Sequence, residues 1–475
     1  MRRTKLVCTI GPATYGRIPE LVSAGLDVAR LNFSHGVAQD HRHAAAAVRR
    51  ASADGGRTVA ILADLPGPKV RLGHLSRGSI TLREGSRLLI RGDGGPGDES
   101  VVSTNHPSLG TDLQPGDRIL LADGAAELVV VRSGNPIETE VVRGGTIRSA
   151  AGVNIPSERL SLPAITDRDR EALAVALALG VDFIAMSFVR RAADLRELRK
   201  LLGRQRIGLV AKLETRAAVE DLESILEATD AVMVARGDLG VEIPFEEIPI
   251  VQKRIVSRSV AVGRPVIVAT QMLESMTNHS RPTRAEASDA ATAVLDGADA
   301  VMLSAETAVG RFPIDAAQAA ARICAFAEEN GASYETVPDP SERALQHIDR
   351  DPEGHAAWAI ASAAADLADR DPAVAAIACY TTSGRSAELL ASARPHRPIF
   401  AFSADSVVVR QLALRRGVIP VLADQPADTD AVVSLVASYL TGSAGLPVGA
   451  SVVVVAASPI GQAQTNVLRV HRLGS

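Results

Sequence analysis

Eight short apolar runs recur along the first two thirds of the chain, and segments with helical periodicity lie between them. Two of these segments, AADLRELRKLL and AAVEDLESILEA, repeat their apolar residues at the spacing of an amphipathic helix. Runs that are apolar on both faces are typical of parallel strands covered by helices. Eight such strands favour a closed (β/α)8 TIM barrel over an open sheet. The runs occupy residues 4–10, 27–35, 58–65, 182–190, 208–214, 231–238, 265–271 and 300–307.

Two segments interrupt this rhythm of strand and helix. After the third run, the strand-like pieces SRLLIRG, DRILLAD and AELVVVRS are bounded by turn residues, which predicts an inserted small all-β domain placed to act as a lid. After a polar linker, helices alternate with AAIACYTTSG, RPIFAFSA, VIPVLA and ASVVVVAA, which predicts a C-terminal three-layer α/β domain. The predicted boundaries are 1–66 and 159–335 for the barrel, 67–158 for the insertion and 340–475 for the last domain.

The composition is that of an ordinary globular chain, with 46% hydrophobic and 22% charged residues. A formal net charge of -4 with interspersed signs creates no broad basic surface, so we expect neither nucleic acid nor a membrane as a partner. The apolar stretch after MRRTK is too short for a signal peptide, and no run approaches a membrane span. Cys8, Cys324 and Cys379 are widely separated, which favours buried thiols in a reducing cytoplasm.

Each apolar run ends in polar or charged residues. In a (β/α)8 barrel the carboxyl ends of all strands open onto one face, where active sites are built. We therefore expect residues from distant parts of the sequence to surround one pocket of the size of a small phosphorylated metabolite. The residues are Thr9, Asn32, Ser34, Asp64, Arg190, Lys212, Glu214, Arg236, Asp238, Thr270, Gln271, Ser304 and Glu306.

Glu214 and Asp238 end two neighbouring runs, so their backbones are expected about 5 Å apart across the ladder. Two carboxylates in this arrangement can share one hard divalent cation such as Mg2+. Lys212 precedes Glu214 by two residues, so both side chains point to the same side of the strand. A Lys212–Glu214 ion pair that only closes the barrel rim is a structural alternative. Thr270 and Arg30 at the same face favour the metal site over that alternative.

Arg30, Asn32 and Ser34 alternate along the second run, and His35 stands at its exit. Polar residues at every second position of a strand that faces a barrel interior need a ligand or an ion to satisfy them. Taken singly, each is more often a capping residue or a core group whose hydrogen bonds are satisfied. Gly237 in ARGDLG would let backbone N–H groups approach an anion, although glycine is also expected at any turn from strand to helix.

In the last domain, YTTSGRSAELLASAR passes from a strand into a helix through hydroxyl residues, a glycine and an arginine. Hydroxyls, free amides at a helix start and one guanidinium suit the phosphate of an effector. An ordinary helix N-cap followed by a loop glycine is the equal alternative. The candidate residues are Thr381, Thr382, Ser383, Gly384, Arg385 and Ser386.

Several of these stretches together resemble the pyruvate kinase family, and the resemblance extends over essentially the whole chain. The family transfers a phosphoryl group from phosphoenolpyruvate to ADP with Mg2+, giving pyruvate and ATP, as the last step of glycolysis. The resemblance also implies a cytoplasmic homotetramer regulated by a phosphorylated effector. The stretches that carry it are TKLVCTIGPAT, DVARLNFSHG, VAKLET, VMVARGDLGVEIP, PVIVATQMLESM, RPTRAEASD and AVLDGADAVMLSAET.

Carried over residue by residue, Glu214 and Asp238 resemble the ligands of Mg2+, for which Mn2+ can substitute. Lys212 resembles the catalytic lysine that faces the transferring group. Thr270 and Ser304 resemble the end of a hydroxyl and water relay that delivers a proton. Arg30 resembles the catalytic arginine that binds the phosphate. The resemblance assigns substrate binding to Arg30, Lys212, Gly237, Asp238 and Thr270.

The resemblance places nucleotide binding where the insertion meets the barrel. Asn32, His35 and Arg71 resemble the contacts of ADP or ATP, and Asp123 is the lid carboxylate expected beside the nucleotide and its own Mg2+. Arg168 stands where the family more often has a lysine, so the charge is kept while the geometry can differ.

One departure from the family concerns monovalent cations. Potassium-activated members have a threonine and a lysine, then a glutamate, after the third strand, whereas this chain reads ADLPGPKVR. Lys69 resembles the branch that works without K+, because a fixed ammonium near Asn32, Ser34 and Asp64 supplies the same charge. We therefore predict that K+ is not required. The residues of the K+ site, or of its Lys69 substitute, are Asn32, Ser34, Asp64, Leu65 and Lys69.

Two smaller departures from the family lie near the end of the barrel and in the last domain. Ala305 replaces the usual glycine, and SPIGQAQTN brings no cation to the effector loop, so the identity of the effector stays open. Other barrel enzymes combine Mg2+ with phosphoenolpyruvate or an enolate, but they lack this insertion together with this last domain. A catalytically silent paralogue that only binds metabolites or assembles is the remaining alternative, and the complete set of catalytic residues argues against it.

Overall fold

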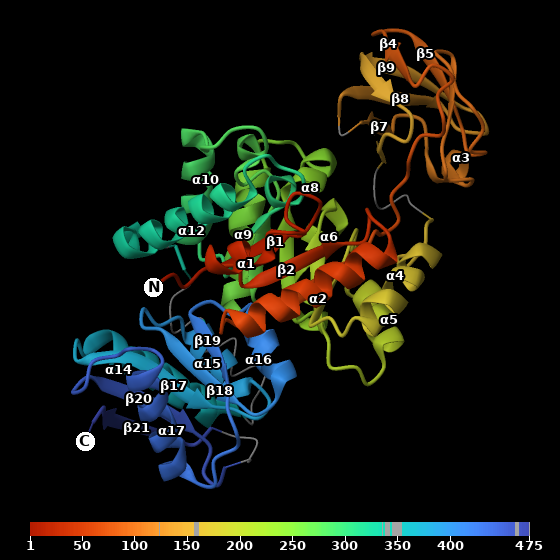
Figure 1. Ribbon diagram of the computed structural model, residues 1–475. Coiled ribbons are helices and arrows are strands. Elements are labelled where there is room, and N and C mark those ends of the chain that lie inside the picture. The colour runs from red at the N-terminus through yellow and green to blue at the C-terminus, as the bar shows by residue number, and fades with distance from the viewer. Residues whose placement is uncertain are drawn as a thin grey trace.

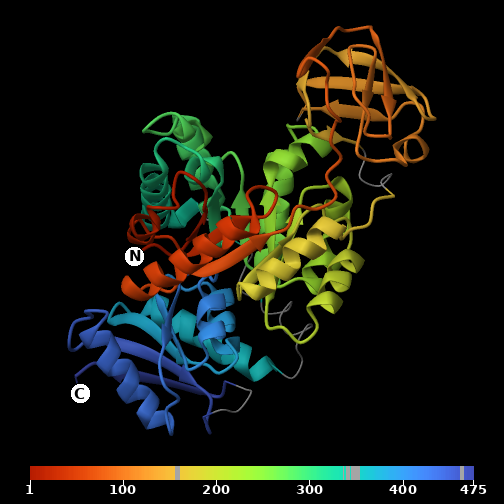
Figure 2. The same cartoon turned by 45° about the vertical axis from the view of Figure 1, so that its right-hand side comes forward.

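The computed structural model describes residues 1–122, 124–155, 161–334, 336–337, 343, 354–460 and 465–474. Figures 1 and 2 show a central barrel, an all-β insertion that projects from one end of it, and a C-terminal α/β domain packed against the other end. The predicted boundaries at residues 158–159, 335 and 340 lie outside the described residues. Among the described helices, none has the length and apolar character that a membrane crossing requires.

Eight parallel strands form a closed barrel, which confirms the predicted fold class. The barrel strands follow one another around the ring in the order of the sequence. β3 and β12 pair directly although the insertion separates them in the sequence, and β1 pairs with β16 to close the ring. All strand residues except the last of β2 are buried, because helices cover the outside and side chains fill the inside. The strands are β1 (Lys5–Thr9), β2 (Val28–Asn32), β3 (Ala60–Asp64), β12 (Phe183–Met186), β13 (Gly208–Leu213), β14 (Ala231–Ala235), β15 (Val266–Ala269) and β16 (Ala300–Leu303).

Helices surround the barrel, and two of them begin with reciprocal capping contacts. The hydroxyls of Thr166 and Thr283 accept from the N–H groups of Asp169 and Glu286, whose carboxylates accept from the cap N–H in return. The barrel helices are α1 (Ile18–Ser23), α2 (Ala38–Asp54), α4 (Asp167–Ala178), α5 (Ala192–Leu202), α6 (Arg216–Glu220), α7 (Leu222–Ala228), α8 (Arg236–Glu242), α9 (Ile248–Ala261), η2 (Glu274–Thr277), α10 (Arg284–Leu295), α11 (Ala305–Ala308), α12 (Pro313–Asn330) and η3 (Ala332–Tyr334).

The insertion folds around a hydrophobic cluster of its own, separate from that of the barrel. Its main sheet has the order β11-β7-β8-β9-β5-β6, and β10 pairs with β4 beside it. The three predicted strand-like pieces correspond to β5, β7 and β8. The elements are β4 (Ser79–Leu82), β5 (Arg87–Arg91), β6 (Val101–Ser103), α3 (Leu109–Asp112), β7 (Arg118–Leu121), β8 (Ala126–Arg132), β9 (Ile137–Arg143), β10 (Gly145–Arg148) and β11 (Val153–Asn154).

The C-terminal domain has three layers, with α14, α15 and α16 on one face of the sheet and α17 on the other. The sheet order is β19-β18-β17-β20-β21. Its last strand was not predicted, because β21 is a partly exposed antiparallel edge strand without a continuous apolar run. The elements are α14 (His355–Arg370), β17 (Val374–Tyr380), α15 (Arg385–Ala393), β18 (Ile399–Ser403), α16 (Ser406–Leu412), β19 (Val418–Leu422), α17 (Thr429–Gly442), β20 (Ser451–Ala456) and β21 (Val467–Arg472).

A buried carboxylate joins the barrel to the C-terminal domain. Asp182, immediately before β12, is 1% exposed and accepts from the backbone N–H of Ile61 at 2.7 Å. The same carboxylate accepts from Arg49 of α2 at 2.9 Å and from Arg410 of α16 at 2.6 Å. One side chain therefore connects a strand and a helix of the barrel with a helix of the last domain.

We predict that Asp182→Ala lowers the free energy of unfolding by about 3 kcal/mol, because two arginines lose a buried partner. Urea unfolding followed by circular dichroism measures the change. Asp366→Ala removes an exposed pair with Arg370 on α14 and is the matched control, with an expected loss below about 1 kcal/mol. Equal losses in the two variants would contradict a special role for the buried carboxylate.

Candidate active site

The carboxyl end of the barrel holds a network of buried charged side chains from three strands. Arg30 of β2 donates from Nε to Oδ2 of Asp64, at the end of β3, at 2.7 Å, and from Nη1 to the hydroxyl of Thr9 at 2.9 Å. The ammonium of Lys212 on β13 lies 2.9 Å from Oε1 of Glu214 and 3.2 Å from Oδ1 of Asp64. The structure thus brings together residues that are far apart in the sequence.

The electrostatics of this network keep Lys212 charged. Burial lowers the pKa of Lys212, but the negative charges of Asp64 and Glu214 outweigh burial and hold the pKa above its ordinary value. Burial likewise raises the pKa of Asp64, but Lys212 and Arg30 outweigh it and the pKa is lowered. The pKa of Glu214 is raised by burial and by the nearby charge of Asp238, against the opposing effect of Lys212. A cation bound between Glu214 and Asp238 would offset both the burial of the Glu214 carboxylate and its repulsion from Asp238.

Two residues after β12 complete this network, and the sequence did not indicate them. The hydroxyl of Ser187 accepts from Lys212 Nζ at 2.7 Å and donates to the carbonyl of Leu65 at 2.7 Å. The backbone N–H of Phe188 donates to Oε2 of Glu214 at 2.6 Å, with Phe188 at φ 54°. The predicted strand continued through both residues, whereas the observed strand ends before them and the chain turns toward the site.

Arg236 supports the backbone around Gly237 and Thr270. Arg236, the first residue of α8, pairs with Asp289 at 2.6 Å and donates to the carbonyl of Thr270 at 2.6 Å. Thr270 and Gln271 have φ values of 66° and 54°, so these carbonyls are turned out of β-geometry and Arg236 satisfies them. The N–H of Gly237 donates to the Thr270 hydroxyl at 2.8 Å. The predicted anion-binding N–H is therefore engaged by Thr270 in this structure.

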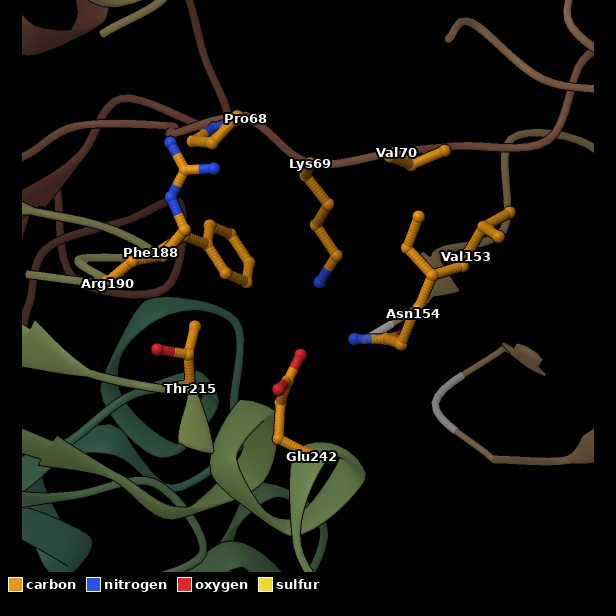
Figure 3. A pocket seen from close by; sticks show the side chains of 10 residues that line it. Pro68, Lys69, Val70, Val153, Asn154, Phe188, Arg190, Thr215 and Glu242 are labelled. Carbon is orange, nitrogen blue, oxygen red and sulfur yellow. The ribbon is translucent and has the colours of Figure 1, made fainter. Parts of the chain in front are cut away.

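Lys69 reaches into the site from the segment that leads into the insertion. Its ammonium lies 3.2 Å from Oδ1 of Asp238 on α8 and 6.0 Å from the ring centre of Phe188. Figure 3 shows Lys69 pointing from this segment into a pocket, with Phe188 on one side, Asn154 on the other and Glu242 below. The insertion and the barrel both line this pocket, so it changes shape if the insertion moves.

The ammonium of Lys69 was predicted to lie near Asn32, Ser34 and Asp64, but in the structure it pairs with Asp238. In the described residues its ammonium pairs with Asp238 and lies near the ring of Phe188, and no hydrogen bond or ion pair joins it to Asn32, Ser34 or Asp64. The side-chain oxygen of Asn32 accepts from the N–H of Ser34 at 3.1 Å. Oδ2 of Asp64 pairs with Arg30, and Oδ1 pairs with Lys212. Leu65 is buried, and its carbonyl accepts from the hydroxyl of Ser187.

Glu214 and Asp238 fit a divalent cation. Both are hard oxygen donors, and their charges interact strongly enough for Asp238 to raise the pKa of Glu214. Oδ1 of Asp238 already holds an ammonium, which shows that the position attracts a cation. In the part of the chain that the structure describes, no group of three histidine, cysteine or acidic side chains is arranged for a metal. Two protein carboxylates would therefore leave most of the coordination of Mg2+ to water and substrate.

Cationic groups gather where the insertion meets the barrel. Burial lowers the pKa of His35, and the positive charges of Arg71 and Arg168 lower it further. Arg168 donates to the backbone carbonyl of Ser34 at 2.9 Å, so it lies over the end of β2. A neutral imidazole among guanidinium groups is an arrangement that suits a polyanion such as a nucleotide phosphate. Asp123, the predicted lid carboxylate, lies outside the described residues.

Ser304, directly after β16, has a buried hydroxyl without a hydrogen-bond partner among the described residues. Its N–H donates to Oε2 of Glu306 at 2.7 Å, and Oε1 of Glu306 accepts from the N–H of Leu273 at 3.1 Å. Burial raises the pKa of Glu306. A buried hydroxyl with unused capacity is expected where a water or a substrate atom completes the site.

The candidate effector loop lies in the C-terminal domain, away from the barrel mouth. Gly384 has φ 91°, and its N–H donates to the hydroxyl of Thr381 at 3.0 Å. The hydroxyl of Ser386 is 2.7 Å from that of Thr465. Thr382 and Ser383 are exposed, and α15 begins at Arg385. Gly384 is the N-cap residue of α15 and brings no side-chain cap, while the exposed hydroxyls of Thr382 and Ser383 are accessible to an anion.

Comparison with known proteins agrees with this architecture. The family models described as "Pyruvate kinase, barrel domain" and "Pyruvate kinase, alpha/beta domain" match residues 1–317 and 358–471. The pyruvate kinase of Corynebacterium glutamicum is 46% identical and that of Mycobacterium tuberculosis 44%, each over 100% of this chain and 98% or 99% of the relative. A crystal structure of a pyruvate kinase from Cryptosporidium parvum matches with a TM-score of 0.90 and 34% identity, over 99% of this chain and 96% of that one. The resemblance found in the sequence is confirmed.

The Lys69–Asp238 ion pair generates a prediction about metal binding. Lys69→Met removes an ammonium that pairs with the candidate metal ligand Asp238. We expect the substrate-free protein to bind Mn2+ about fivefold more tightly, because an ion pair worth ~1 kcal/mol no longer competes with the metal. Electron paramagnetic resonance of free Mn2+ measures the affinity. Lys253→Met, which breaks a remote pair with Asp296, is the matched control and leaves the affinity unchanged. Weaker binding in Lys69→Met would mean that the lysine assists the metal rather than competing with it.

Proposed function

This chain belongs to the pyruvate kinase family of phosphotransferases, and on that premise we propose that the barrel mouth transfers the phosphoryl group of phosphoenolpyruvate to ADP, giving pyruvate and ATP. The observation that carries this proposal is the buried ammonium of Lys212, held between Asp64 and Glu214 at the open end of the barrel. Phosphoryl transfer depends mainly on positioning and on stabilising negative charge, and a fixed cation supplies both.

Lys212 acts as a permanent positive charge in this mechanism. Because its pKa is raised, the ammonium stays protonated at neutral pH, which excludes a neutral amine acting as a base. Its role is to stabilise the negative charge that develops on the transferring group and on the enolate. A cation about 4 Å from that charge at an effective dielectric constant of 20 contributes on the order of 4 kcal/mol, or roughly three decades of rate.

Glu214 and Asp238 would hold Mg2+, for which Mn2+ can substitute. Mg2+ supplies positive charge to the carboxylate and enol oxygens of the substrate. Arg30 binds the phosphate, and its pairing with Asp64 and Thr9 fixes the guanidinium before the substrate arrives. The proposed substrate-binding set is Arg30, Lys212, Gly237, Asp238 and Thr270.

Thr270 and Ser304 are the proposed end of the relay that protonates the enolate. Thr270 donates to the carbonyl of Ala269 at 2.6 Å and accepts from Gly237, so its hydroxyl is oriented by the backbone on both sides. The hydroxyl of Ser304 keeps its capacity for a water. These contacts support a proton path of hydroxyls and water rather than delivery by one side chain.

The nucleotide is proposed to bind between the insertion and the barrel. His35, Arg71 and Asn32 form this proposed subsite, and Arg168 adds positive charge beside them. The insertion would cover the phosphates and exclude water from the transfer. Regulation through residues 381–386, a homotetramer, a cytoplasmic location and the domain boundaries given above stay predictions.

A coupled assay of Lys212→Met tests the proposed role of the lysine. We expect kcat to fall by about three decades, because the charge that stabilises the transition state is lost. Circular dichroism checks that the variant folds. Lys200→Met, an exposed lysine of α5, is the control with unchanged activity. A rate close to that of the unmodified protein would remove Lys212 from the mechanism.

The dependence on monovalent cations tests the proposed role of Lys69. We expect the rate in a tetramethylammonium buffer to change less than about twofold when KCl is added, because the ammonium already supplies a fixed charge near the substrate. Assays of initial rate with and without KCl at constant ionic strength measure this. A large rise with KCl would show that Lys69 does not replace the cation.

A further inference from the structure

Two adjoining cavities lie where the C-terminal domain meets the amino ends of the barrel strands. The larger has a volume of about 280 Å3, and its lining includes residues before β13, β14 and β15 of the barrel and residues of α15 and α16. Figure 1 shows α15 and α16 between the barrel and the C-terminal sheet, on the side opposite the insertion. Arg264, Pro265 and Arg415 also line the smaller cavity, so they separate the two spaces. Neither cavity includes a residue of the proposed active site.

Arginine side chains dominate the walls of both cavities. Arg199 pairs with Asp230 at 2.5 Å, Arg415 with Glu388 at 2.7 Å and Arg394 with Asp299 at 3.3 Å. Three lining carboxylates therefore face a larger number of guanidinium groups. The lining arginines are Arg199, Arg206, Arg264, Arg394 and Arg415.

Two of these arginines retain donors for a ligand. Arg394 is 6% exposed as a side chain, yet its buried Nε has no hydrogen-bond partner among the described residues. An unsatisfied buried donor on a charged group is costly, and a bound oxyanion would satisfy it. Arg206 is more than half exposed and, among the described residues, uses one of its five N–H donors, on Asp405 of the C-terminal domain. Arg206 at the larger cavity and Arg394 at the smaller one therefore have hydrogen-bonding capacity to spare.

We propose that this junction is a binding site for a small phosphate-bearing anion. Guanidinium forks match the oxygens of a phosphate group, and four arginines and two carboxylates, Asp230 and Glu388, line the larger cavity. Of the arginines that line the larger cavity, Arg206 and Arg264 belong to the barrel, whereas Arg415 belongs to the C-terminal domain. An anion held by both sets is bound only in a defined arrangement of the two domains, which makes its binding and that arrangement mutually dependent.

The site is distinct from the loop at residues 381–386, although one helix connects them. That loop leads into α15, Glu388 of the same helix lines the larger cavity, and Arg394 follows its last turn. The proposal rests on the geometry of this junction and does not depend on the proposed catalytic function. Its test therefore needs no measurement of activity.

Hydrogen–deuterium exchange of the full chain, titrated with inorganic phosphate at constant ionic strength, tests the proposal. We expect phosphate to slow exchange in residues 203–208 and in residues 411–416 with a common midpoint, because each segment contributes residues to the lining of the larger cavity. Protection in neither segment, or in only one of them, would overturn the site.

Three variants make the test specific. Arg206→Gln removes a donor, and Gln205→Glu adds a negative charge to the same wall without removing a side-chain hydrogen bond present in the described structure. Each is expected to raise the phosphate midpoint about tenfold, equivalent to about 1.4 kcal/mol. Arg204→Gln, an exposed neighbour outside the lining, is the matched control and keeps the midpoint of the unmodified protein. One midpoint shared by all four proteins would mean that phosphate does not bind in this cavity.

Discussion

The neutralisation of one buried ammonium determines the geometry of the barrel mouth. Burial lowers the pKa of Lys212, and Asp64 at the end of β3 and Glu214 at the end of the lysine's own strand outweigh this effect. Asp64 in turn fixes Arg30, and Glu214 fixes the backbone turn at Phe188. Positive charge is therefore placed before any substrate binds, which is the condition under which electrostatic stabilisation lowers a reaction barrier.

A second layer of the site is made of backbone rather than charge. Phe188, Thr270 and Gln271 all adopt positive φ, a conformation that side chains other than glycine seldom take without support. Arg236 provides this support for the last two, through the carbonyls of Thr270 and Gln271 and its own pair with Asp289. The carboxylate of Glu214 provides it for the first. Residues without a proposed contact to substrate thus set the positions of those that have one.

The sequence predicted the parts of this arrangement that follow from strand periodicity. Lys212 and Glu214 share a side of their strand because they are two residues apart, and parallel pairing brings Asp64 and Arg30 to the same rim. Ser187 and Phe188 were missed, because no rule of residue type predicts positive φ at a phenylalanine. The partner of Lys69 was also unpredictable, since a long flexible side chain on an irregular segment can reach several carboxylates. The strand β21 was also missed, because its pairing depends on the exposed edge of β20 rather than on an apolar run of its own.

The pairing of β3 with β12 has a consequence for how the chain assembles. β3 ends at Asp64 and β12 begins at Phe183, so pairing these two strands closes a loop that contains the whole insertion. The insertion has a hydrophobic cluster of its own, built from short-range contacts, which lets it condense independently of the strands on either side. Once condensed, it acts as a short bridge instead of a long loop, and the entropy lost on joining the two halves of the barrel is correspondingly smaller.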